Sequence, residues 1–190
     1  RGRALHLLMA ADAAAFSAQA ERQYALATTM TERMVALVLL MHNACPGAQQ
    51  LAEQFYQRHA DNPLLVDKWL GLQASNPQAG TLERVQALTE HPAFSWRNPN
   101  KVRALIGTFA RGNRARFHQD GGAGYRLLGS AVATLDAINP QIAARTVAVF
   151  NGWRRLEPLR QAQMRNELER LAAMPALSPD TTEIVTRALA

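Results

Sequence analysis

Side chains that could bind a metal or attack a substrate are few in this chain of 190 residues. A zinc peptidase needs a His-Glu-x-x-His motif, because that spacing places two imidazoles on one helical face beside a carboxylate that activates water. None of the five histidines is followed by glutamate; they are His6, His42, His59, His91 and His118. The sequence therefore predicts no metal ligands and no cofactor in this chain.

Nucleophiles are equally sparse. Cys45 is the single cysteine, and the Pro46-Gly47 pair that follows it marks a helix boundary rather than an activating environment. Ser130 follows Gly129 but lacks the second glycine of a nucleophile elbow. We predict no catalytic residue, and hence no enzymatic activity for the chain on its own.

Cys45 also bears on where the protein works. One cysteine cannot form an intramolecular disulfide, which excludes a disulfide-stapled secreted fold and favours a cytoplasmic location. No apolar run approaches the roughly 18 residues that a membrane-spanning helix requires, so no membrane partner is expected. The chain begins with Arg1 rather than methionine, and we interpret it as a fragment cut from a longer protein.

Arg145 is a candidate binding residue because of its position on an expected helix from Pro140. It lies three residues after Ile142 and four before Val149, along the apolar stripe, where an unpaired charge is costly. Gln141 lies one turn earlier, so together they could offer a guanidinium and an amide to a carboxylate or peptide group. An internal salt bridge or a solvated arginine would fit the same spacing.

Arg103 lies at the flank of another apolar stripe, formed by Val102, Leu105, Ile106 and Phe109. It could edge a cavity or meet solvent there, and the spacing alone favours solvent.

The elements that must position these residues are helices. Asparagine precedes proline at four sites, which suits an N-cap followed by proline at the first helical position; the asparagines are Asn62, Asn76, Asn98 and Asn139. Ser178-Pro179 repeats this pattern, and Thr29 to Glu32 matches a capping box. Helical apolar spacing then predicts helices at 3–18, 30–43, 46–60, 63–75, 79–90, 99–110, 113–118, 124–138, 140–150, 158–173 and 179–189.

The expected fold is all-α and forms one domain over residues 1–190. Short connections favour antiparallel neighbours, and stacked helical hairpins make either a bundle or a superhelix of the armadillo and HEAT kind. No clean sequence repeat is visible, so we expect an irregular superhelix.

Positive charge is concentrated in residues 97–170, which contain 13 Lys and Arg against five Asp and Glu. Basic helices can bind nucleic acid, but these arginines are spread over several helices without aromatic interleaving or a known motif. A solvated basic surface is the favoured interpretation.

Several uncommon strings resemble the end of bacterial aminopeptidase N. They are residues 98–107 (Asn-Pro-Asn-Lys-Val-Arg-Ala-Leu-Ile-Gly), Phe117-His118, Gly124-Tyr125, residues 139–145 (Asn-Pro-Gln-Ile-Ala-Ala-Arg), Val66-Asp67-Lys68-Trp69 and Leu72-Gln73-Ala74. The similarity runs in order from near residue 1 to the last four residues.

This resemblance implies a fourth, all-helical, C-terminal domain with armadillo-like packing that covers the catalytic domain of a zinc aminopeptidase. Enzymes of that family remove N-terminal amino acids from peptides. Their zinc-binding motif and the Gly-x-Met-x-Asn loop that holds the free amine are absent from this chain. Gln141 and Arg145 match family positions that face the internal cavity near bound peptide, and Arg103 matches a second cavity arginine.

The sequence thus predicts a non-catalytic domain that caps the active site and lines the substrate chamber, with Arg145, Gln141 and Arg103 as substrate-binding residues. Its partners would be the other domains of the same polypeptide and the peptide substrate, and zinc would be bound elsewhere in the parent enzyme. The alternatives are an independent helical scaffold for protein partners and a basic nucleic-acid-binding domain.

Overall fold

The computed structural model describes residues 2–190, and every regular element in that range is helical. The α-helices are α1 (Gly2–Ala11), α2 (Ala13–Leu26), α3 (Met30–His42), α4 (Ala48–His59), α5 (Pro63–Ser75), α6 (Thr81–Leu88), α7 (Pro99–Val102), α8 (Thr108–Gly112), α9 (Arg114–Phe117), α10 (Ala123–Asp136), α11 (Pro140–Val147), α12 (Pro158–Ala172) and α13 (Pro179–Leu189). A π-helical turn, η1 (Arg103–Gly107), and two 3₁₀ segments, η2 (Asp120–Gly122) and η3 (Ala148–Arg155), complete the set. The prediction of an all-α fold is confirmed.

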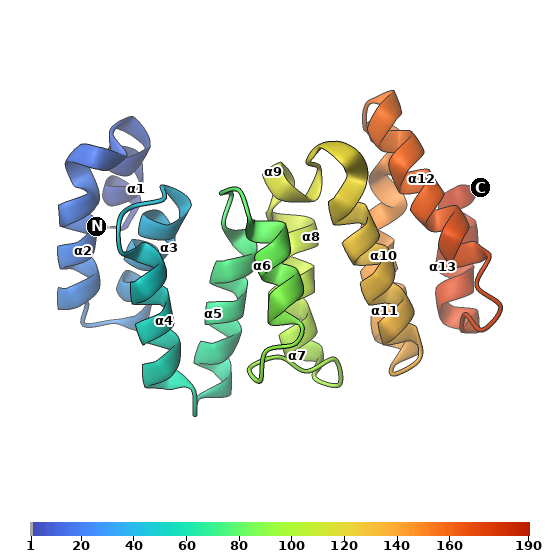
Figure 1. The fold of residues 1–190 in the computed structure, drawn as a ribbon, viewed down its shortest axis with the longest axis horizontal. Helices are drawn as coiled ribbons and strands as arrows, with labels where there is room; N and C mark the ends of the chain where they lie inside the picture. The colour runs from blue at the N-terminus through green and yellow to red at the C-terminus, as the bar shows by residue number, and fades with distance from the viewer. Residues whose placement is uncertain (1) are drawn as a thin grey trace.

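The helices stand side by side in an elongated row, and their order along the row follows their order in the sequence (Figure 1). Helices close in sequence pack together, above all α2 with α3 and α10 with α11. The two chain ends consequently lie at opposite ends of the row (Figure 1). This is the predicted superhelix of helical hairpins, in which each element contacts its neighbours rather than a central core.

One apolar cluster runs along the row and holds the helices together. Its largest fully buried side chains include Trp69 and the aromatic rings of Tyr125, Phe55, Phe109, Phe117 and Phe150. Phe109 and Phe117 meet edge to face at 6.1 Å, and Phe117 meets Tyr125 in the same way at 5.2 Å. These rings join α8 and α9 to α10, and so fix the helices that carry the basic residues.

Local capping signals place most of the helix starts. Asn62, Asn98 and Asn139 each accept backbone N–H bonds at the start of α5, α7 and α11. Thr29 caps α3 and Ser178 caps α13 in the same manner. Five of the six predicted caps therefore lie where the sequence placed them, because each satisfies donors within its own first turn.

Two expectations about helix boundaries are wrong. The single helix predicted over residues 3–18 is divided at Asp12, whose carboxylate accepts from the backbone N–H of Ala15 and begins α2. Asn76-Pro77 does not start a helix, since α6 begins at Thr81 after Gly80, which has a left-handed φ of 81°.

Contacts from a distant segment explain why Asn76-Pro77 remains a loop. Asn113 donates from its side-chain amide to the carbonyl oxygens of Ala74 (2.9 Å) and Asn76 (2.7 Å). Arg116 donates to the carbonyl of Pro77 at 2.6 Å. The carbonyls of Asn76 and Pro77, which would accept the first bonds of a helix starting there, are thus engaged by Asn113 and Arg116 instead.

Replacing Asn113 with alanine should lower the free energy of unfolding by about 2 kcal/mol, because Asn113 is only 3% exposed and its loss leaves two carbonyls unpaired. Urea unfolding of the purified chain would measure this. The matched control is Asn166→Ala on the exposed surface of α12, which should cost little or nothing. Equal effects of the two substitutions would show that the Asn113 contacts do not stabilise the fold.

Candidate functional site

The helix that begins at Pro99 is wound irregularly where it carries the first candidate arginine. It runs as α7, widens into the π-turn η1 from Arg103 to Gly107, and continues as α8. Single π-turns inside α-helices are found frequently at functional sites. Arg103, Gly107 and Arg111 follow one another at intervals of four residues, so they share one face of this helix.

A second wall is formed by α11 and the start of η3. Ile142, Arg145 and Thr146 line it from α11, and Ala148 follows at the beginning of η3. The two walls are tied together by Arg111, whose guanidinium donates to the carbonyl oxygen of Arg145 at 2.8 Å.

Between the walls lies a cavity of about 440 Å³, which we call the arginine pocket. Its lining residues are Pro99, Asn100, Val102, Arg103, Gly107, Arg111, Ile142, Arg145, Thr146 and Ala148. Three are arginines and none is acidic. Gly107 provides no side chain between Arg103 and Arg111, which leaves space between the two guanidinium groups.

The three guanidinium groups have no acidic partner within residues 2–190. Arg103 donates to the side-chain oxygen of Asn100 at 3.0 Å, and Arg111 donates to the Arg145 carbonyl. Each retains further N–H donors, since a guanidinium carries five. Three uncompensated cations around one cavity favour an anion, and the guanidinium fork matches a carboxylate or phosphate.

The structure brings two of the three predicted binding residues together. Arg103 and Arg145 both line the pocket, although both side chains are largely exposed at its edge. Gln141 is exposed and does not line it. The sequence did not lead us to predict Arg111 as a binding residue. It could have been found from its spacing, because Arg103, Gly107 and Arg111 follow at intervals of four residues and so share one helical face.

Potential metal ligands lie apart from one another. Among residues 2–190 no three His, Cys, Asp or Glu side chains lie close enough together to hold a metal ion. His42 pairs with Ser75 at 3.2 Å and His118 with Tyr125 at 2.8 Å, and burial raises the pKa of the Cys45 thiol. The donor set of this part of the chain does not fit zinc. Over the same range no helix is long and apolar enough to cross a membrane.

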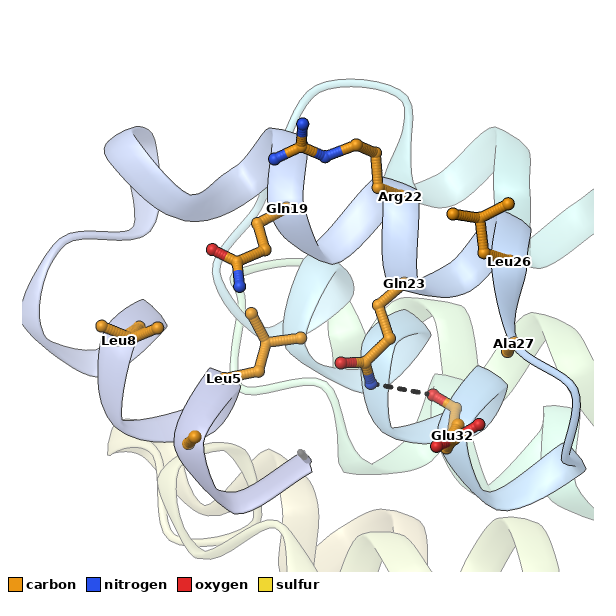
Figure 2. A pocket seen from close by; sticks show the side chains of 9 residues that line it. Leu5, Leu8, Gln19, Arg22, Gln23, Leu26, Ala27 and Glu32 are labelled. Carbon is orange, nitrogen blue, oxygen red and sulfur yellow. Dashed lines mark hydrogen bonds between the residues drawn. The ribbon is translucent and has the colours of Figure 1, made fainter.

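A different pocket lies at the N-terminal end of the row, among α1, α2 and α3 (Figure 2). Its lining mixes apolar side chains such as Leu5 and Leu26 with two opposite charges, Arg22 and Glu32. Gln23 points across it and donates to the backbone carbonyl of Glu32 at 3.3 Å (Figure 2). The charges of Arg22 and Glu32 balance, and the Gln23 amide already donates to a backbone carbonyl. This pocket is therefore less suited to bind an anion than the arginine pocket.

The known proteins that this chain resembles are aminopeptidases. The chain is 41% identical over 163 residues to aminopeptidase N of Caulobacter vibrioides, covering 86% of this chain and 19% of that protein. It is 37% identical over 169 residues to aminopeptidase N of Escherichia coli K12, covering 89% of this chain and again 19% of the relative. This chain therefore spans about a fifth of the length of these relatives.

A solved structure shows the same fold. The crystal structure of Legionella pneumophila aminopeptidase A in complex with aspartic acid matches with a TM-score of 0.90 and 33% identity, over 97% of this chain and 22% of that one. A family described as a domain of unknown function with ARM repeats, DUF3458_C, matches residues 1–190. The chain thus belongs to this family of helical ARM-repeat domains, and it matches about a fifth of the length of its aminopeptidase relatives.

Proposed function

We propose that this chain is the C-terminal helical domain of a zinc-dependent aminopeptidase that removes N-terminal amino acids from peptides, and that residues 1–190 form one domain of it. The observation that carries the proposal is the pattern of similarity to aminopeptidase N, which extends over 86–89% of this chain but only 19% of the relatives. Catalytic residues and zinc ligands would lie in the remaining four-fifths. A single free cysteine fits a cytoplasmic enzyme.

The arginine pocket supplies binding chemistry without reactive groups. We place it in the wall of the substrate chamber, where Arg103 and Arg145 would hold the C-terminal carboxylate of a peptide. The free amine of that peptide would lie at the zinc site of another domain. Gln141, exposed on α11 four residues before Arg145, would reach the peptide backbone from the rim.

This arrangement would favour peptides over folded proteins. A chamber wall with three uncompensated arginines stabilises a free terminal carboxylate, and the chain end of a folded protein reaches such a wall less readily. Binding energy gained far from the scissile bond would lower KM for short peptides.

The proposal is tested by measuring zinc content and peptidase activity in the intact polypeptide and in the 190-residue chain alone. The intact polypeptide that contains this chain should bind zinc and release N-terminal amino acids from peptides. The purified 190-residue chain should do neither, and should associate with the rest of the polypeptide when the two are mixed. Peptidase activity in the 190-residue chain, or none in the intact polypeptide, would contradict the proposal. Absence of association would favour an independent scaffold.

A further inference from the structure

The arginine pocket continues into a second cavity along the same pair of helical walls. This second pocket has a volume of about 370 Å³ and is lined by Ala110, Arg111, Arg114, Phe117, His118, Val149, Gly152, Leu156 and Met164. Arg111 lines both cavities, and Ala148 of the first is followed in the chain by Val149 of the second. The two cavities therefore adjoin at Arg111, whose guanidinium bonds across to the Arg145 carbonyl. We call the two adjoining cavities the groove.

The second pocket is positively charged and has no acidic lining residue. Arg114 is exposed, and no ion pair of its side chain occurs in the described part of the chain. Asp120 and Glu157 each lie 3.7 Å from Arg160 instead. Arg114 is thus left to a ligand from outside the chain, and Arg111, which donates one bond to the Arg145 carbonyl, retains further N–H donors.

Apart from the two arginines and His118, the residues that line this pocket are apolar. Phe117 is 1% exposed and packs on Tyr125, while His118 is held by Tyr125 at 2.8 Å and accepts at its carbonyl from Arg160 at 2.9 Å. Burial, with the nearby charges of Arg160 and Arg114, lowers the pKa of His118, so its imidazole is neutral at pH 7. The remaining walls are aliphatic: Val149, Leu156 and Met164.

We propose that Arg111 and Arg114 form a second carboxylate-binding subsite, which takes a carboxylate of a longer peptide whose other carboxylate lies at Arg103 and Arg145. This inference rests on the proposed function, because it assumes that the groove faces peptide. The apolar walls suit the methylene groups that carry an acidic side chain, and the two arginines provide the charge-assisted donors.

The chain segment from Arg103 to Arg114 sets the spacing between the two subsites. A continuous α-helix over these eleven positions would span roughly 16 Å, but the segment contains the π-turn η1 and the non-helical Asn113, so the separation is on the order of 10–20 Å. An extended peptide covers about 3.3–3.6 Å per residue, so carboxylates about three to six residues apart would span both subsites. Peptides with this spacing should bind more tightly than peptides with one carboxylate.

The test uses the intact polypeptide and alanine-rich peptides with a common N-terminal residue. One set carries only a free C-terminal carboxylate, at lengths of three to eight residues. A second set adds a glutamate at successive distances from that carboxylate, and a third has the glutamate with a C-terminal amide. KM and kcat are compared for the wild type, Arg114→Gln, and the control Arg165→Gln, which changes the same charge on exposed α12. Thermal unfolding verifies that all three are folded.

Arg114→Gln should raise KM about threefold to thirtyfold for peptides whose two carboxylates are about three to six residues apart. It should leave three-residue peptides unchanged, and Arg165→Gln should change neither. A KM rise in long peptides without glutamate would identify the C-terminal carboxylate as the occupant, whereas a rise in the amide set would identify the acidic side chain.

An equal change in KM for every peptide in Arg114→Gln, or no change for any, would overturn the second subsite. The aminopeptidase proposal would still stand if Arg145→Ala raised KM for peptide acids more than for peptide amides. Loss of the proposed function would instead appear as an intact polypeptide without aminopeptidase activity. Retention of a single-stranded oligonucleotide at low salt, lost in Arg114→Gln, would assign the groove to phosphate and also overturn the subsite.

Discussion

Replacing Arg145 with alanine should raise KM of the intact polypeptide about tenfold to a hundredfold for short peptides with a free C-terminal carboxylate. Arg145 has no acidic partner within residues 2–190 and lines the arginine pocket with Arg103. Its removal would cost a charge-assisted pair with the carboxylate, made in the ground state and transition state alike, so kcat should change little. Steady-state kinetics on matched peptide acids and peptide amides measure the effect.

Gly107→Leu provides an independent variant that retains every charge. A Cβ at Gly107 would lie 3.6 Å from Arg111 Nη1 and 3.7 Å from Arg103 Cγ, which is ordinary contact, so the larger side chain would extend between the two guanidinium groups. It should raise KM for peptide acids as Arg145→Ala does. Peptide amides should be nearly unaffected by either variant. A similar rise for acids and amides would mean that the pocket does not recognise the carboxylate.

Replacing Asp136 with alanine should lower the free energy of unfolding by about 3 kcal/mol. Asp136 ends α10 and is 8% exposed; its carboxylate accepts from the Ser178 backbone N–H (2.7 Å), the Ser178 hydroxyl and the Thr181 hydroxyl (both 2.5 Å). These bonds hold the first turn of α13 against α10. Alanine would leave three part-buried donors unpaired, and urea unfolding at pH 7 would show the loss.

The stabilising effect of Asp136 should depend on pH. Burial raises the pKa of its carboxyl, but the hydrogen bonds from Ser178 and Thr181 lower it more, so the net pKa lies below its ordinary value of 3.8. A carboxyl with a lowered folded-state pKa stabilises the fold above its unfolded-state pKa and loses that contribution as pH falls through the folded-state value. The stability difference between wild type and Asp136→Asn should therefore shrink from pH 7 to pH 3. A constant difference would contradict this assignment.

Local chemistry explains which parts of the fold were predictable. Asn62, Asn98 and Asn139 satisfy donors within their own helices, so sequence alone was sufficient to place those helix starts. Asn76 is also followed by proline. However, the side chains of Asn113 and Arg116, about forty residues away, donate to the carbonyls of Asn76 and Pro77 and hold them in a loop. That contact could not be inferred from the local sequence. Asp12 divides a continuous helical pattern because its side chain caps α2.

The site was predictable only in part for the same reason. The position of Arg145 beside Ile142 made it a candidate on spacing alone, whereas Arg103 became one only through the family resemblance. Their shared pocket depends on a long-range contact, the bond from Arg111 of α8 to the Arg145 carbonyl of α11. Arg111 was missed because its role lies in joining those two walls. Gln141 was placed with Arg145 on one face, but it lies outside the lining.

Photo-crosslinking would test most directly whether this domain lines the substrate chamber. A short peptide with a benzophenone side chain next to its free C-terminus is irradiated with the intact polypeptide after metal removal by a chelator, so that the peptide is not cleaved. Mass spectrometry should then locate adducts on residues 99–111 and 142–148, and an excess of unlabelled peptide acid should suppress them. Adducts confined to regions outside residues 1–190, or to α1–α4, would contradict the account.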